Sequence, residues 1–177
     1  MNKVYSFDPS ISSGKLAVCV FDMSSDGEPY EHIIDLQVWK TKIKPADDRN
    51  GMKRGKDIAE WVNNLLIEGS LVITEDLVNK PNWARGERRV RGRARSLQLT
   101  QVINTTIVNV AQFNKCDPFL MDPPKIVTSK KKRLVIINSI IPGVWQRFGV
   151  RPSDHLGDAI YRGRYVIKMI QCGIFQI

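Results

Sequence analysis

Short apolar runs near the start of the chain predict strands. Val4 to Phe7 and Leu16 to Phe21 are such runs, and the Ser- and Gly-rich segment between them indicates a hairpin turn. Ile33 to Lys42 follows with alternating apolar and polar positions, which is typical of an edge strand with one wetter face. Pro9 should end the first strand, because proline cannot donate to a hydrogen-bond ladder.

From Met52 onward the spacing of apolar residues becomes helical. Residues between Ile58 and Leu66 recur at intervals of three and four, which marks one face of a helix. Leu71 to Asp76 begins with an apolar run, which predicts a strand covered on both faces and parallel to its neighbour. A second helix is expected from Leu99 to Val110, and Phe119 to Met121 is a short fifth strand.

Two further helices are expected near the end of the chain. Ser129 can cap the first of them, Pro142 to Pro152 is a connector, and Ser153 can cap the last helix, which runs to about Ile170. The predicted fold is therefore α/β: three antiparallel strands and then parallel strands, in one mixed five-stranded sheet with helices on both faces. The length fits a single domain over residues 1–177.

Basic residues concentrate in two segments. Asn79 to Arg95 contains Trp83, Lys80 and six arginines against one acid, and it lacks apolar periodicity, so a mobile basic loop is expected. Lys130 to Arg133 opens a helix where the helix dipole prefers acids, which favours a role outside helix stability. With a net charge of +9, these segments indicate a polyanionic partner, namely DNA, RNA or an anionic membrane. The candidate DNA-binding residues are Trp83, Arg85, Arg88, Arg89, Arg91, Arg93, Lys130, Lys131 and Lys132.

The numbers and spacing of the cysteines and histidines bear on metal binding and on the compartment of the protein. The three cysteines are odd in number and widely spaced, and there are only two histidines, so the sequence disfavours a zinc site. Free thiols fit a reducing cytosol. No signal peptide opens the chain and no apolar run approaches the ~20 residues of a membrane span, so we expect a cytoplasmic protein.

Acidic residues stand at three places that packing explains poorly. Asp8 follows the first strand, Glu75 ends the strand from Leu71, and Asp154, His155 and Asp158 lie at the start of the last helix. Ligand sites in open α/β sheets gather outside the carboxyl ends of strands. Hard divalent cations bind carboxylate oxygens, and two such ions about 3.5–4 Å apart can clamp the attacking and leaving oxygens of a phosphodiester. The pattern therefore predicts metal-dependent cleavage of nucleic acid.

Each of these residues also has a plainer interpretation. Asp8 and Glu75 could be ordinary acids at loop edges, Asp154 could only stabilise the helix dipole, and His155 could be a surface histidine. Asp158 is harder to explain in this way, because its small neighbours on either side leave room for a metal ion. The combination carries the prediction.

Three motifs resemble those of RuvC-type Holliday junction resolvases, which belong to the ribonuclease H-like superfamily. The motifs are Phe7-Asp8-Pro9 with the turn to Gly14, Val72-Ile73-Thr74-Glu75, and His155-Leu156-Gly157-Asp158-Ala159. The order of elements matches over nearly the whole chain. The resemblance implies that Asp8, Glu75 and Asp158 hold Mg²⁺, with Mn²⁺ as a substitute. It also implies that His155 takes part in catalysis, while Asp154 remains an alternative for the last ligand.

The resemblance further implies a homodimer that makes paired nicks in a four-way DNA junction, as a crossover junction endodeoxyribonuclease. It assigns Trp83 to the junction centre and the lysines from Lys130 to Lys132 to the junction backbone. The basic segment after Glu75 is longer and more basic than expected for a cellular resolvase, and Asp154 precedes His155. These departures indicate a divergent member, such as one encoded by a bacteriophage.

Two other kinds of protein remain open at this point. One is a different ribonuclease H-like nuclease, either a hybrid-cleaving ribonuclease or a transposase-like enzyme, which its substrate would distinguish. The other is a non-catalytic basic nucleic-acid-binding protein. That interpretation leaves the placement of Asp8, Glu75 and Asp158 to chance.

Overall fold

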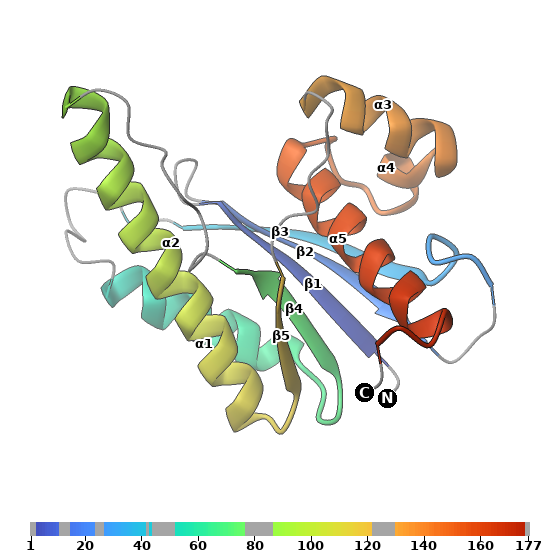
Figure 1. Cartoon of the computed structure of the whole chain (residues 1–177), viewed down its shortest axis with the longest axis horizontal. Coiled ribbons are helices and arrows are strands. Elements are labelled where there is room, and N and C mark those ends of the chain that lie inside the picture. The colour runs from blue at the N-terminus through green and yellow to red at the C-terminus, as the bar shows by residue number, and fades with distance from the viewer. Residues whose placement is uncertain are drawn as a thin grey trace.

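A five-stranded mixed sheet forms the centre of the computed structural model (Figure 1). The structure describes residues 3–10, 15–23, 27–41, 43, 52–76, 87–121 and 130–175, without the side chains of 10, 87–99 and 130–133. The strand order is β3-β2-β1-β4-β5. The strands are β1 (Lys3–Ser10), β2 (Lys15–Asp22), β3 (Ile33–Lys40), β4 (Leu71–Glu75) and β5 (Asp117–Met121). The first three pair antiparallel, and β4 is parallel to both β1 and β5, which confirms the predicted fold class.

Helices cover both faces of this sheet (Figure 1). They are α1 (Met52–Leu65), α2 (Glu87–Phe113), α3 (Lys130–Ile140), α4 (Val144–Arg147) and α5 (Asp154–Gln171). One core lies under α1 and α2 and takes Tyr5 and Phe7 of β1, while the other lies under α5 and takes Val4. Because successive side chains of a strand point to opposite faces, the even-numbered residues of β1 face α5.

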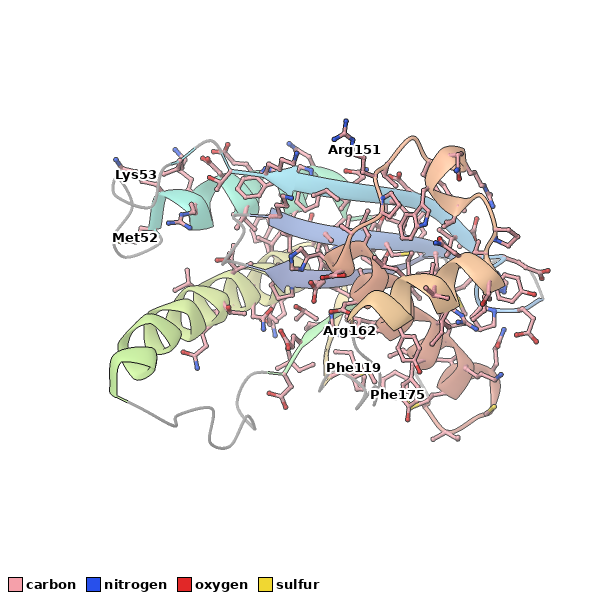
Figure 2. All side chains as sticks on the ribbon, turned by 90° about the horizontal axis from the view of Figure 1, so that it is seen from above. Met52, Lys53, Phe119, Arg151, Arg162 and Phe175 are labelled. Atoms are coloured by element: carbon pink, nitrogen blue, oxygen red, sulfur yellow. The ribbon has the colours of Figure 1, made fainter. Side chains whose placement is uncertain are left out.

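The last described residues of the chain lie against β5, the edge strand on the parallel side of the sheet. The ring of Phe175, just after α5, meets the ring of Phe119 on β5 edge to face, with centroids 4.5 Å apart (Figure 2). This aromatic contact fixes the end of α5 relative to β5. No helix in the described ranges is long and apolar enough to cross a membrane.

Three expectations about the elements were wrong. Pro9 does not end β1, which continues to Ser10; the parallel pairs with β4 reach only to Ser6, so beyond it β1 has an open side that tolerates proline. The helix α2 begins at Glu87, so the second half of the expected basic loop is helical. The connector before α5 contains the short helix α4, whose Trp145 is buried.

The cysteines give a first test of the core. Cys19 on β2 is fully buried and Cys116 nearly so, whereas Cys172 is exposed. Burial raises the pKa of the Cys19 thiol well above its ordinary value, and burial also raises the pKa of Cys116. We therefore expect a thiol reagent at pH 8 to modify one cysteine of the native protein quickly and all three only after denaturation.

The Cys172→Ser variant is the control, and it should lose the fast reaction. Fast labelling of native Cys172→Ser would contradict the burial of Cys19 and Cys116. Since the folded-state pKa of both buried thiols is raised, their contribution to stability is present at neutral pH and should fall as the pH rises past the ordinary thiol range.

Candidate active site

Asp8 lies near the end of β1 on the face covered by α5, and it is 7% exposed. Its Oδ2 lies 2.9 Å from Nδ1 of His155, and its Oδ1 forms an ion pair at 3.5 Å with Nη2 of Arg162. Figure 2 shows Arg162 where α5 lies over the sheet. Both carboxylate oxygens of Asp8 are therefore engaged by groups from α5.

Glu75 ends β4, the strand next to β1. The parallel pairing ends at Ser6 and Ile73, and Asp8 and Glu75 each follow two residues further along their own strands. Leu71 and Ile73 belong to the core under α5, and the two-residue period places Glu75 on that face as well. The strand register thus places two of the predicted carboxylates on the same face of neighbouring strands, near their carboxyl ends.

A polar contact from α2 fixes the backbone at the end of β4. Asn104 is 7% exposed, and its side-chain amide donates to the carbonyl oxygen of Glu75 at 2.6 Å. The hydroxyl of Thr74 donates to Oδ1 of Asn104 at 2.7 Å. Sequence reasoning missed Asn104, although a polar residue between the apolar positions Ile103 and Ile107 was a visible signal. Asn104 therefore holds the backbone of Glu75 in place.

The first turns of α5 carry the remaining acids and the histidine. The hydroxyl of Ser153 accepts a hydrogen bond from the backbone N–H of Leu156 at 3.2 Å, which caps the helix as predicted. His155, Asp158 and Arg162 follow at intervals of three and four residues, so they share the face of α5 that looks toward the sheet. The side chain of His155 is 20% exposed, which leaves its ring accessible at the rim of the site.

Glycine lets α5 come close enough for these contacts. A Cβ added at Gly163 would overlap the ring of Phe21 and stand 3.1 Å from Cβ of Ser6. Any larger residue at this position would therefore push the helix away from β1 and β2. The close approach of α5 is what brings Arg162 and His155 within reach of Asp8.

Arg162 is a second residue that sequence reasoning missed. It is 2% exposed, its Nη1 donates to the carbonyl oxygen of Phe7, and its Nε is buried with no hydrogen-bond partner among the described residues. Its position one turn after Asp158, among apolar residues of α5, was the only signal in the sequence. A buried cation among the predicted metal ligands changes the electrostatics of the site.

The Ser153 cap can be tested by a single substitution. Ser153→Ala removes the acceptor for an N–H in the first turn of α5, and we expect the free energy of unfolding to fall by about 1 kcal/mol. Ser139→Ala in α3 is the matched control, because that exposed hydroxyl donates only to the carbonyl of Ile136. Chemical denaturation measures both, and an equal loss in the two variants would contradict the capping role.

Asp8, Glu75, Asp158 and His155 offer the oxygen and nitrogen donors that suit a divalent cation, and they come from the carboxyl ends of β1 and β4 and from the first turns of α5. All four side chains are among the residues that the structure describes. Among these described residues, no three or more His, Cys, Asp or Glu side chains lie close enough together to bind a metal ion. Asp8 is instead paired with His155 and Arg162. The residues fit a metal by type and location, but the ligand-free arrangement is not a preformed cage.

The choice between His155 and Asp154 stays a prediction, and so does the set of DNA-binding residues. The contact of His155 with Asp8 favours His155. Trp83 and Arg85 lie outside the described residues. The backbones of the other DNA-binding candidates lie in α2 and in the first turn of α3, and their side chains are not described. These are Arg88, Arg89, Arg91, Arg93, Lys130, Lys131 and Lys132.

Comparison with known proteins gives similarity in structure rather than in sequence. No family model matches the chain, and no curated protein matches it in sequence. RuvC of Thermus thermophilus has a TM-score of 0.61 at 16% identity, over 97% of this chain and 96% of its own. The same protein in complex with a Holliday junction substrate gives 0.59 at 16% identity, over 98% and 97%.

A viral protein has a similar structure as well. The Fowlpox virus resolvase, in complex with Holliday junction DNA, has a TM-score of 0.53 at 10% identity, over 95% of this chain and 98% of its own. These matches cover nearly the whole of both chains, and the low identities fit a divergent relationship. The chain therefore has the RuvC-type, ribonuclease H-like fold that its sequence motifs indicate.

Proposed function

We propose that this protein is a metal-dependent endonuclease that resolves four-way or related branched DNA by paired nicks. The observation that carries the proposal is the contact between His155 and Asp8 in a RuvC-type fold, with Glu75 on the same face of the neighbouring strand. Two carboxylates at matching positions of neighbouring strands, with a histidine from a helix on one of them, suit hydrolysis of a phosphodiester.

The residues of the site divide into ligands and a proton carrier. Asp8, Glu75 and Asp158 would hold Mg²⁺, or Mn²⁺ in its place, and the bound ion would polarise the phosphate and activate the attacking water. His155 lies at the rim with its ring partly exposed, so it can exchange a proton with the leaving oxygen. Asp154 is the alternative for the last position if His155 has no such role.

Two basic segments flank the site and would hold the DNA. The amino-terminal part of α2 projects past the carboxyl ends of the strands, and α3 lies on the other side of the same edge (Figure 1). The sequence places arginines in the first segment and lysines in the second, and the net charge is +9. Such side chains bind phosphates without a sequence preference, which suits recognition by DNA shape. The complexes of RuvC and the Fowlpox virus resolvase with Holliday junctions support this substrate class.

A homodimer is part of the proposal. A four-way junction has approximate two-fold symmetry, and paired nicks require two sites related by that symmetry. The chain carries one set of the predicted catalytic residues, so a second copy would supply the other site.

One cleavage assay tests the proposal. The protein is incubated with a four-way junction, a linear duplex and an RNA–DNA hybrid, each with Mg²⁺ and with a chelator. We expect paired nicks in the junction only with Mg²⁺, and much slower cutting of the other two substrates. Preferential degradation of the hybrid would indicate a ribonuclease instead. Tight junction binding without any cleavage would indicate a non-catalytic DNA-binding protein.

A further inference from the structure

Arg162 is a cation placed inside a site that is otherwise built from acids. It is 2% exposed, and its guanidinium lies between the carbonyl oxygen of Phe7 and Oδ1 of Asp8. A buried charge is costly unless it is paired and hydrogen-bonded, and here β1 supplies both partners. The guanidinium is thus fixed by the backbone as well as by the carboxylate.

In this arrangement each oxygen of Asp8 faces a group from α5, so a metal ion would have to share Asp8 with these groups. Oδ1 faces the guanidinium at 3.5 Å, and Oδ2 faces the His155 ring nitrogen at 2.9 Å. A divalent cation that approaches Asp8 meets the repulsion of Arg162, which cannot move away without leaving the Phe7 carbonyl. A phosphate group of DNA would change this balance, because it brings negative charge and additional oxygen ligands.

We propose that Arg162 is a positioning residue that acts as the counter-cation of Asp8 and keeps the affinity of the free site for divalent metal low. Metal is then taken up together with the DNA phosphate and not before it. This inference rests on the proposed function, since it concerns the metal at that same site. It adds a residue to the site and an order of binding.

A purely structural role for Arg162 makes a different prediction. If the guanidinium only joins α5 to β1, its replacement should lower stability and leave the metal affinity of the folded protein unchanged. If it opposes the metal, removal of its charge should strengthen metal binding even where stability falls. Metal affinity measured on the free protein separates the two roles without any use of cleavage.

The experiment measures Mn²⁺ binding to the DNA-free protein by calorimetry or by the electron paramagnetic resonance of unbound Mn²⁺. Arg162→Gln removes the charge and keeps a donor for the Phe7 carbonyl, and it should bind Mn²⁺ roughly tenfold more tightly than wild type. Arg162→Lys keeps the charge and should stay near wild type. Arg164→Gln is the matched control, because Arg164 lies on the same helix but over the ring of Tyr30, and it should not change Mn²⁺ binding.

Equal or weaker Mn²⁺ binding by folded Arg162→Gln overturns the inference. If that variant does not fold, wild type still tests the proposed order of binding. The inference requires Mn²⁺ to bind the protein–junction complex at least roughly tenfold more tightly than the free protein, after correction for Mn²⁺ bound by the junction alone. Equal affinities contradict it. Absence of junction cleavage with these affinity changes intact would count against the proposed nuclease and leave the role of Arg162 standing.

Discussion

Asp8→Asn should lower the rate of junction cleavage roughly a thousandfold while junction binding stays the same or tightens. A catalytic metal ion contributes several kcal/mol of transition-state stabilisation, and about 4 kcal/mol corresponds to a thousandfold in rate. An amide is a weaker ligand than a carboxylate for a hard cation, so this contribution should be lost. Binding should not fall, because removal of a negative charge reduces the repulsion of phosphate. Single-turnover cleavage and a gel-shift titration measure the two effects.

The control for this variant is Asp117→Asn, the same substitution at the exposed start of β5, at the opposite end of the strands from Asp8. It should cut at the wild-type rate. Asp8→Asn also removes the anionic partner of the buried Arg162, so its thermal unfolding must be recorded and the assay run well below the transition. A folded Asp8→Asn protein with wild-type turnover would remove Asp8 from the site.

Gly163→Ala should destabilise the protein more than Gly157→Ala, which adds the same methyl group elsewhere on α5. The added Cβ would overlap the Phe21 ring, with 2.6 Å to its Cζ, and would crowd Ser6 in the same core. Overpacking of a buried contact costs about 1–3 kcal/mol and occasionally more, which exceeds the gain of about 1 kcal/mol from the helix propensity of alanine. We expect the free energy of unfolding to fall by about 2 kcal/mol or more, as measured by chemical denaturation.

Gly157→Ala provides the matched comparison on the same helix. Its Cβ would lie 3.2 Å from the terminal carbon of Ile137, which is the flexible end of a side chain and can move. Its stability should stay within about 1 kcal/mol of wild type, since the propensity gain offsets mild crowding. If the two variants prove equally stable, α5 does not lie as close to β1 and β2 as the structure has it.

The sheet and its acids were predictable because their signals are local. Apolar runs of strand length, each with an acid at or near its carboxyl end, mark β1 and β4 in the sequence, and the order of elements then fixes the mixed sheet. Asp8 and Glu75 follow directly from that pattern. Their closeness in space follows from parallel pairing, which the apolar run from Leu71 predicts.

The start of α2 was not predictable from periodicity. Its amino-terminal part leaves the sheet, so no apolar face is needed there, and the sequence shows charge where a packed helix would show a repeat (Figure 1). Arginine, alanine, leucine and glutamine between Glu87 and Leu99 are good helix formers, and that composition was the signal available. A continuous loop was the wrong inference from a missing hydrophobic pattern.

Arg162 could not be placed from sequence because its burial depends on a distant contact. A basic residue in a helix is ordinarily solvated, with its charged end in water. Here α5 comes close to the sheet at Gly163 and Phe21, and the Phe7 carbonyl and Asp8 take the place of water around the guanidinium. Three separate segments of chain must be in position before the environment of Arg162 exists.

The register between β1 and β4 limits how this sequence can change in evolution or in design. Asp8 and Glu75 share a face only because both lie two positions beyond the Ser6–Ile73 pair. Deletion or insertion of one residue within either strand before its acid would turn that carboxylate to the opposite face, whatever its identity. Length changes should therefore be tolerated in the turns between strands and excluded from the strands themselves, even where every catalytic residue is retained.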